Sequence, residues 1–135
     1  MGSTFETVQE LKLGATFTVG TEVANVINVA VQIFDRENKN EIGERVAIPF
    51  YLSDDAEGDD VVSSAPDNGI AIGTDGVMIE WTDNKAGYLI SEVDGDVDIN
   101  MTHGAGDKTV YLNLIMPDGQ LYTSAAITFS AAIDS

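Results

Sequence analysis

Apolar and polar residues alternate with a period of two over several short stretches of this chain. The alternation is clearest at residues 27–33, 46–52, 77–81 and 110–116, where every second residue is apolar. Because successive side chains of a β-strand point to opposite faces, each stretch predicts a strand with one buried face. Branched and aromatic residues dominate these stretches, as strands favour. No stretch carries a sustained apolar stripe of helical period, so the pattern predicts an all-β protein.

Turn-forming sequences separate these stretches. Asp-Gly occurs at 75–76 and at 94–95, and Pro-Asp-Gly at 117–119 predicts a hairpin between the last two strands. About seven short strands with such turns are typical of a sandwich of two antiparallel sheets. A closed barrel is the structural alternative.

Two residues of these strands carry a more specific expectation. Pro49 has no backbone N–H to donate, so its strand is expected at a sheet edge or to start late. Trp81 lies in phase with Val77 and Ile79 and is predicted to lie in the core between the sheets.

The length of 135 residues fits one domain, and 44% hydrophobic residues can build a core without staples. We expect the sandwich at 21–135, preceded by an N-terminal arm or extra strand at 1–20. There is no cysteine, which excludes disulfides, thiolate zinc sites and thiol nucleophiles. The first 14 residues carry no secretory signal pattern, and the apolar stretches are too short to cross a bilayer.

The charge balance narrows the range of partners. Twenty-three acidic residues face six basic ones, giving a formal charge of −17. Such a surface repels nucleic-acid phosphates and anionic lipid, so we expect neither nucleic acid nor membrane as a partner. It favours solubility and basic or cation-bearing partners.

The order of the motifs resembles that of bacterial immunoglobulin-like modules of the invasin and intimin type. The resemblance covers about residues 21–130 and rests on loose motifs whose order carries the signal. They are VAVQIFD at 29–35, VAIPFYLS at 46–53, GTDGV at 73–77, KAGYLI at 85–90 and AAITF at 125–129. The resemblance implies an immunoglobulin-like β-sandwich that serves adhesion or scaffolding and has no shared catalytic residues.

Invasin-type modules usually occur in tandem on secreted chains, whereas this one stands alone. Single modules without a signal resemble those on tailed-bacteriophage virions, as capsid decoration or tail proteins. The resemblance therefore implies a non-enzymatic structural protein of a virion, made in the host cytoplasm. Its partner would be a viral capsid or tail protein, which it would bind as a homo-oligomer or in many copies on a lattice.

Candidate docking residues lie mainly in the N-terminal arm. Phe5, Val8, Leu11 and Leu13 are apolar groups outside the alternating core strands, so we expect them to bury area against a partner. Tyr111 falls on an outward phase of its strand and is a further candidate anchor.

Catalytic chemistry has little support in the sequence. His103 is the sole histidine, so a site with two histidines from one chain is excluded. It lies in a glycine-rich stretch without a nucleophile elbow, and we expect it to hydrogen-bond to backbone or solvent. Carboxylate pairs are too frequent in this composition to mark a glycosidase. We predict no catalytic residue and no cofactor.

Calcium is the stronger site hypothesis, although a weak one. Asp94, Asp96 and Asp98 have the spacing that begins an EF-hand, but the sixth and twelfth positions are Ile99 and Ala105. The three aspartates are weak calcium candidates on one face of a strand. A solvated acidic edge is the simpler interpretation.

Two other interpretations stay open. A carbohydrate- or cell-surface-binding adhesion module, with or without calcium, is the second functional hypothesis. The acidic loop at 54–60 offers a second oxygen-rich site for such an ion. An acidic mimic of DNA is a third hypothesis, which the charge alone permits.

Overall fold

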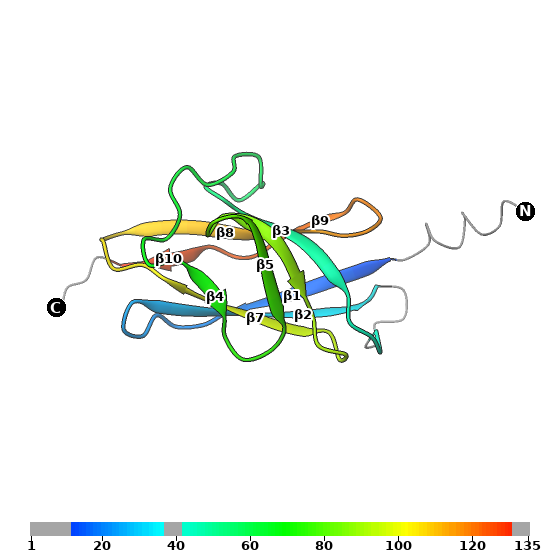
Figure 1. Cartoon of the computed structure of the whole chain (residues 1–135). Coiled ribbons are helices and arrows are strands. Elements are labelled where there is room, and N and C mark those ends of the chain that lie inside the picture. The colour runs from blue at the N-terminus through cyan, green and yellow to red at the C-terminus, as the bar shows by residue number, and fades with distance from the viewer. Residues whose placement is uncertain (1–11, 37–41, 131–135) are drawn as a thin grey trace, which may run out of the picture.

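The computed structural model describes residues 12–36 and 42–130. Within these ranges the chain forms ten strands and no helix, in two stacked antiparallel sheets (Figure 1). The predicted all-β class and the two-sheet sandwich are confirmed, whereas the strands outnumber the seven expected.

The smaller sheet has the strand order β1-β2-β7-β4. Its members are β1 (Leu13–Val19), β2 (Val26–Asp35), β4 (Ile70–Ile72) and β7 (Asp96–Thr102). The alternation in β2 turns Val29, Val31 and Ile33 toward the other sheet, where they are buried. Because β1 pairs with β2 over its whole length and buries Leu13 and Ala15 in the core, residues 13–19 belong to the sandwich.

The larger sheet has the order β10-β8-β3-β6-β5, and β9 also pairs with β8. Its members are β3 (Ala47–Ser53), β5 (Val77–Thr82), β6 (Ala86–Ile90), β8 (Lys108–Ile115), β9 (Leu121–Thr123) and β10 (Ile127–Phe129). β9 and β10 follow one another along the edge of β8 that faces away from β3. The predicted hairpin at 117–119 is confirmed, since the Gly119 N–H donates to the Met116 carbonyl at 2.8 Å.

The core lies between the inner faces of the two sheets. Its largest fully buried side chains come from both of them: Leu13, Ile27, Ile33, Ile99 and Met101 from the smaller sheet, and Ile48, Phe50, Leu52, Leu89, Leu112, Leu114 and Phe129 from the larger. Burying each side chain of this size contributes about 1.5–3 kcal/mol, so the alternating strands supply the driving force for this fold.

Most of the strands follow the immunoglobulin order. In the constant-type immunoglobulin fold, strands A, B, E and D form one sheet and C, F and G the other. Here β1-β2-β7-β4 occupies the first set of places, and β3, β8 and the β9–β10 edge occupy the second. The β5–β6 hairpin is the addition. It lies between the fourth and fifth strands of that plan and extends the larger sheet beyond β3.

The chain crosses between the sheets where β4 leads into β5 (Figure 1). The crossover, residues 73–76, contains the first Asp-Gly pair, and Gly76 has a φ of +96°, which glycine adopts at little cost. The second Asp-Gly pair ends the turn before β7, and Gly95 has a φ of +90°. Both predicted turns are thereby confirmed.

Two predictions about individual strand residues are wrong. The strand of Pro49 is interior, because β3 lies between β8 and β6. The proline is tolerated because pairing with β8 begins only at Phe50, so this half of β3 has a single neighbouring strand. Trp81 is not in the core, since 58% of it is exposed. In β5 it is Met78, paired with the buried Leu89, that faces the interior.

Candidate functional site

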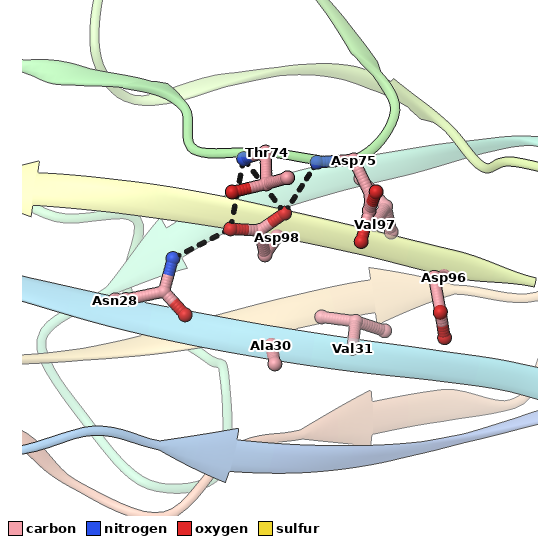
Figure 2. A pocket seen from close by; sticks show the side chains of 8 residues that line it. All are labelled: Asn28, Ala30, Val31, Thr74, Asp75, Asp96, Val97 and Asp98. Carbon is pink, nitrogen blue, oxygen red and sulfur yellow. Dashed lines mark hydrogen bonds between the residues drawn. The ribbon is translucent and has the colours of Figure 1, made fainter.

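The first candidate site is a polar hollow on the outer face of the smaller sheet. Asp98 is one of the residues that line it. Its side chain points outward because its neighbours Val97 and Ile99 point into the core. Figure 2 shows its carboxylate between the β4–β5 crossover and Asn28 of β2. The hollow measures about 340 Å³, near the lower limit of small-molecule sites.

The oxygens of Asp98 are already occupied by the protein itself. The Asp75 N–H donates to Oδ1 at 2.7 Å, and the Thr74 N–H reaches both oxygens at 3.0 and 3.1 Å. The Asn28 side-chain amide donates to Oδ2 at 2.6 Å. An added Cβ at Gly73 would stand 2.2 Å from Oδ2, so a larger residue there would displace the carboxylate or the crossover. These contacts fix the crossover against β7. We call Asn28, Thr74, Asp75 and Asp98 the Asp98 cluster.

The same contacts set the ionisation of Asp98. Burial by itself would raise the pKa of this carboxyl group. The N–H of Asp75, the amide of Asn28 and the N–H of Thr74 donate to the charged form, and together they hold the pKa below its usual value of 3.8. The carboxylate is therefore charged at neutral pH and acts as a cap for backbone N–H groups.

The calcium candidates do not form a metal site. In the described ranges, no group of three or more His, Asp or Glu side chains could hold a metal ion, so Asp94, Asp96 and Asp98 do not meet as one. Instead Asp94 accepts the N–H of Asp96 at 3.2 Å, and Asp98 caps the crossover.

The acidic loop at 54–60 also uses its carboxylates internally. Asp55 accepts the N–H groups of Asp60 at 3.1 Å and of Asp59 at 3.2 Å. The bond from Asp60 is the main reason that the pKa of Asp55 is lowered. The Tyr51 hydroxyl donates to the Gly58 carbonyl at 2.7 Å, which holds the loop on the outer face of the larger sheet. The carboxylate of Asp55 thus stabilises the backbone of its own loop.

His103 accepts a hydrogen bond from the backbone, as expected. Its Nδ1 receives the Asp67 N–H at 3.0 Å. The Asp67 carboxylate lies 3.4 Å from the same nitrogen and accepts the Gly104 N–H. The ring is buried and packs against Phe129 at a centroid distance of 5.6 Å. His103 therefore ties two loops together at this end of the sandwich.

The predicted docking residues have mixed outcomes. Phe5, Val8 and Leu11 lie outside the described residues. Leu13 is not a docking residue, because it begins β1 and is 2% exposed, within the core. Tyr111 does face outward from β8, where its register partner is a buried serine of β3, and it is half-buried.

The second candidate site is an apolar surface on the added hairpin. Val77, Ile79, Trp81 and Tyr88 are 44%, 50%, 58% and 36% exposed. Ile79 pairs directly with Tyr88 across the hairpin, so both point outward, and Val77 continues the row. Trp81 meets Tyr88 edge to face, with ring centroids 4.7 Å apart. We call these four residues the hairpin face.

A β-bulge sets the position of Trp81. Glu80 pairs with Gly87 and Thr82 with Ala86, which leaves Trp81 as the extra residue of β5. Gly87 makes the bulge possible, because a Cβ there would lie 2.0 Å from the Ile79 carbonyl oxygen. Bulges re-aim a side chain, and this one directs the indole ring toward Tyr88.

The other half of the same outer face is covered by the protein. Asn113 of β8 faces outward yet is fully buried beneath the acidic loop. Its amide donates to Ser53 Oγ at 2.9 Å, and its oxygen accepts from Thr123 at 2.7 Å. A Cβ at Gly58 would lie 2.6 Å from that oxygen, so the loop packs directly onto it. The larger sheet therefore has a loop-covered half and an open half.

Comparison with known proteins adds no assignment: neither a family model nor a curated protein matches this sequence. No helix in the described parts of the chain is long and apolar enough to span a membrane.

Proposed function

We propose that this chain is a non-enzymatic structural protein of a bacteriophage virion, a capsid decoration or accessory subunit that docks through the hairpin face. The observation that carries the proposal is the exposed row of β5. Three large apolar side chains and a tyrosine lie on one surface without cover from the described parts of the protein. Contiguous exposed apolar surface of this kind marks interaction sites in soluble proteins.

The composition of the hairpin face suits protein binding. Tryptophan and tyrosine are the residues most enriched among the few side chains that dominate binding energy. Trp81 and Tyr88 already hold each other in an edge-to-face pair, which reduces the freedom they would lose on docking. The location supports the same role, since the hairpin is an addition to the immunoglobulin strand order and the core is complete without its outer row.

The small size of the hairpin face favours attachment in many copies. A stable one-to-one interface buries about 800 Å² on each partner, more than four side chains supply. On a symmetric lattice, linked weak contacts gain effective concentration and become firm attachment. A decoration subunit meets this condition. The order of the motifs in this chain, which resembles that of immunoglobulin-like modules that serve adhesion or scaffolding, supports a non-enzymatic role.

Retention on particles tests the proposal. The tagged chain would be produced during particle assembly, and occupancy measured after gradient purification. We expect the double variant Ile79→Ser/Trp81→Ala to lose at least tenfold in occupancy, because it removes the centre of the docking surface. The matched control is Thr16→Ser/Thr18→Ser, which changes exposed residues of the opposite edge strand β1. Equal occupancy of both variants and the wild type would contradict docking through the hairpin face.

Carbohydrate binding is the second candidate, and Trp81 is the observation that favours it. An exposed indole ring next to Tyr88 provides an apolar platform on which a sugar ring can pack. Calorimetry with a glycan panel separates the two functions. Heat of glycan binding that is measured for the wild type and lost in Trp81→Ala, together with unchanged particle occupancy of that variant, would favour the adhesion module over the decoration protein.

A further inference from the structure

The free edge of β5 is a second feature of the hairpin. β5 ends the path of the larger sheet and pairs only with β6 among the described strands. It is six residues long. An edge strand presents a row of unpaired N–H and C=O groups, which can accept a further strand. The outward row of β5 lies beside that edge, so one incoming segment would meet both backbone groups and apolar side chains.

β5 lacks most of the protection that edge strands usually carry. The edge strand β1 turns its apolar residues inward and leaves Thr16 and Thr18 exposed. β5 does the opposite, with Ile79 and Trp81 exposed, and it carries no lysine. Its protective devices are the bulge at Trp81, which lies at the end of the strand, and the charge of Glu80.

The charges around β5 define the chemistry of the occupant. Residues 73–84 contain Asp75, Glu80 and Asp83 and no Lys or Arg, and Lys85 at the end of the hairpin turn directs its Nζ to the Ser63 carbonyl at 3.4 Å. Glu92 and Asp94 follow in the β6–β7 turn, where Arg45 lies 3.6 Å from Glu92. Carboxylates thus flank the apolar row at both ends. A second copy of this chain brings a further charge of −17, so like-charge repulsion opposes pairing of β5 with itself.

We infer that the partner is recognised by strand addition: an extended, basic segment of the partner protein pairs with the free edge of β5. Its apolar side chains continue the row of Val77, Ile79 and Trp81, and its Lys or Arg side chains meet Asp75, Glu80 and Asp83. Main-chain hydrogen bonds supply affinity in this mode, and alternate side chains supply specificity. The inference rests on the proposed function, because it states how the hairpin face takes its partner.

The test uses a defined probe and the full-length chain. The probe is a seven-residue peptide of alternating Lys and Val with blocked ends. Trp81 is the sole tryptophan, so its emission reports binding at the hairpin directly. Amide exchange measured by NMR reports strand pairing. We expect the peptide to shift the emission to the blue and to slow exchange at alternate amides of β5 at least tenfold.

Three comparisons locate the source of the affinity. Two further peptides carry the same sequence with N-methyl groups at either the odd or the even residues, so each keeps its charge but loses half of its backbone N–H donors. At least one of the two should bind tenfold more weakly than the unmethylated peptide. A Glu-Val peptide should not bind. The variant Glu80→Gln/Asp83→Asn should weaken binding several-fold in low salt, whereas the β1 control Thr18→Ser should not.

Each contrary result has a distinct meaning. Unslowed β5 amides, or full binding by both N-methylated peptides, would overturn strand addition. Binding of the Glu-Val peptide would overturn the basic partner. A dimer with protected β5 amides in the absence of peptide would replace the partner by a second copy. The proposed function is contradicted by a different result, namely that the Ile79→Ser/Trp81→Ala variant occupies particles as fully as the wild type.

Discussion

The Asp98 cluster and the hairpin face lie on the outer faces of opposite sheets and differ in how their groups are satisfied. Every oxygen of Asp98 receives an N–H from the chain itself, and the carboxylate is buried. Trp81 and Ile79 contact water over half or more of their surface. A polar group whose partners are all internal holds the fold together, whereas an apolar group without cover is available to a partner. The carboxylate of Asp98 therefore serves the structure, and we propose that the apolar row is the binding surface.

Removing the carboxylate of Asp98 should give the largest loss of stability. Asp98→Ala leaves the N–H groups of Thr74 and Asp75 without their acceptor, and we expect a loss of about 2–3 kcal/mol in the free energy of unfolding. Urea unfolding measures it. The control Asp83→Asn changes an exposed carboxylate of the hairpin turn and should stay within about 0.5 kcal/mol. A loss no larger than that of the control would refute the capping role.

Gly87→Ala should disrupt the hairpin and spare the Asp98 cluster. The new Cβ would lie 2.0 Å from the Ile79 carbonyl oxygen and 2.8 Å from the Glu80 Cα, so β5 must shift away from β6. We expect a cost of about 2 kcal/mol, because backbone must move to relieve the overlap. Amide exchange should quicken in β5 and β6 but not in β7. The control is Gly104→Ala, whose Cβ meets nothing nearer than an Asn25 side-chain atom at 3.3 Å. Uniformly faster exchange throughout the sandwich would contradict a local effect.

The contribution of Asp98 should also depend on pH. Its pKa is held below 3.8 in the fold, so the unfolded chain takes up the proton first as the pH falls. The stabilisation is complete above the unfolded pKa and is lost as the pH falls through the lower folded pKa. Asp98→Asn should therefore cost about 1 kcal/mol at pH 7, and this difference from the wild type should shrink below pH 3.8. Unfolding curves of the two proteins at several pH values measure the difference. A difference in unfolding free energy between the two proteins that grows as the pH falls would contradict a lowered pKa of Asp98.

Trp81→Ala should have the smallest effect on stability. The ring is mostly exposed and its main contact is Tyr88, so we expect a loss of about 0.5 kcal/mol or less. Thermal unfolding with Thr18→Ser as the control checks this. A loss as large as that of Asp98→Ala would mean that Trp81 serves the core, and it would remove the contrast between the two regions.

The sequence predicted the class of fold because alternation and turn residues are local signals. Residues 27–33 and 110–116 became β2 and β8, with their apolar rows in the core. The same signal misled at 77–81, because alternation defines two faces but not which one is covered. Only the pairing of Met78 with the buried Leu89 decides that, and the pairing depends on residues far along the chain.

The candidate site was less predictable for a related reason. The spacing of Asp94, Asp96 and Asp98 is a local pattern, but the donors that occupy Asp98 come from the crossover and from β2. One feature of the sequence pointed to the hairpin face: two short strands joined at 83–85, which are an addition to the immunoglobulin order. Exposure of Trp81 became visible only once the strand order was known.

Hydroxyl-radical footprinting of the chain, free and bound to particles, tests the central claim most directly. We expect Trp81 and Tyr88, which are exposed in the free protein, to be oxidised several-fold more slowly on the particle. Exposed side chains of the opposite edge, such as Thr16 and Thr18, should stay as accessible as before. Equal oxidation of Trp81 and Tyr88 in both states, with the chain still bound, would show that docking uses another surface.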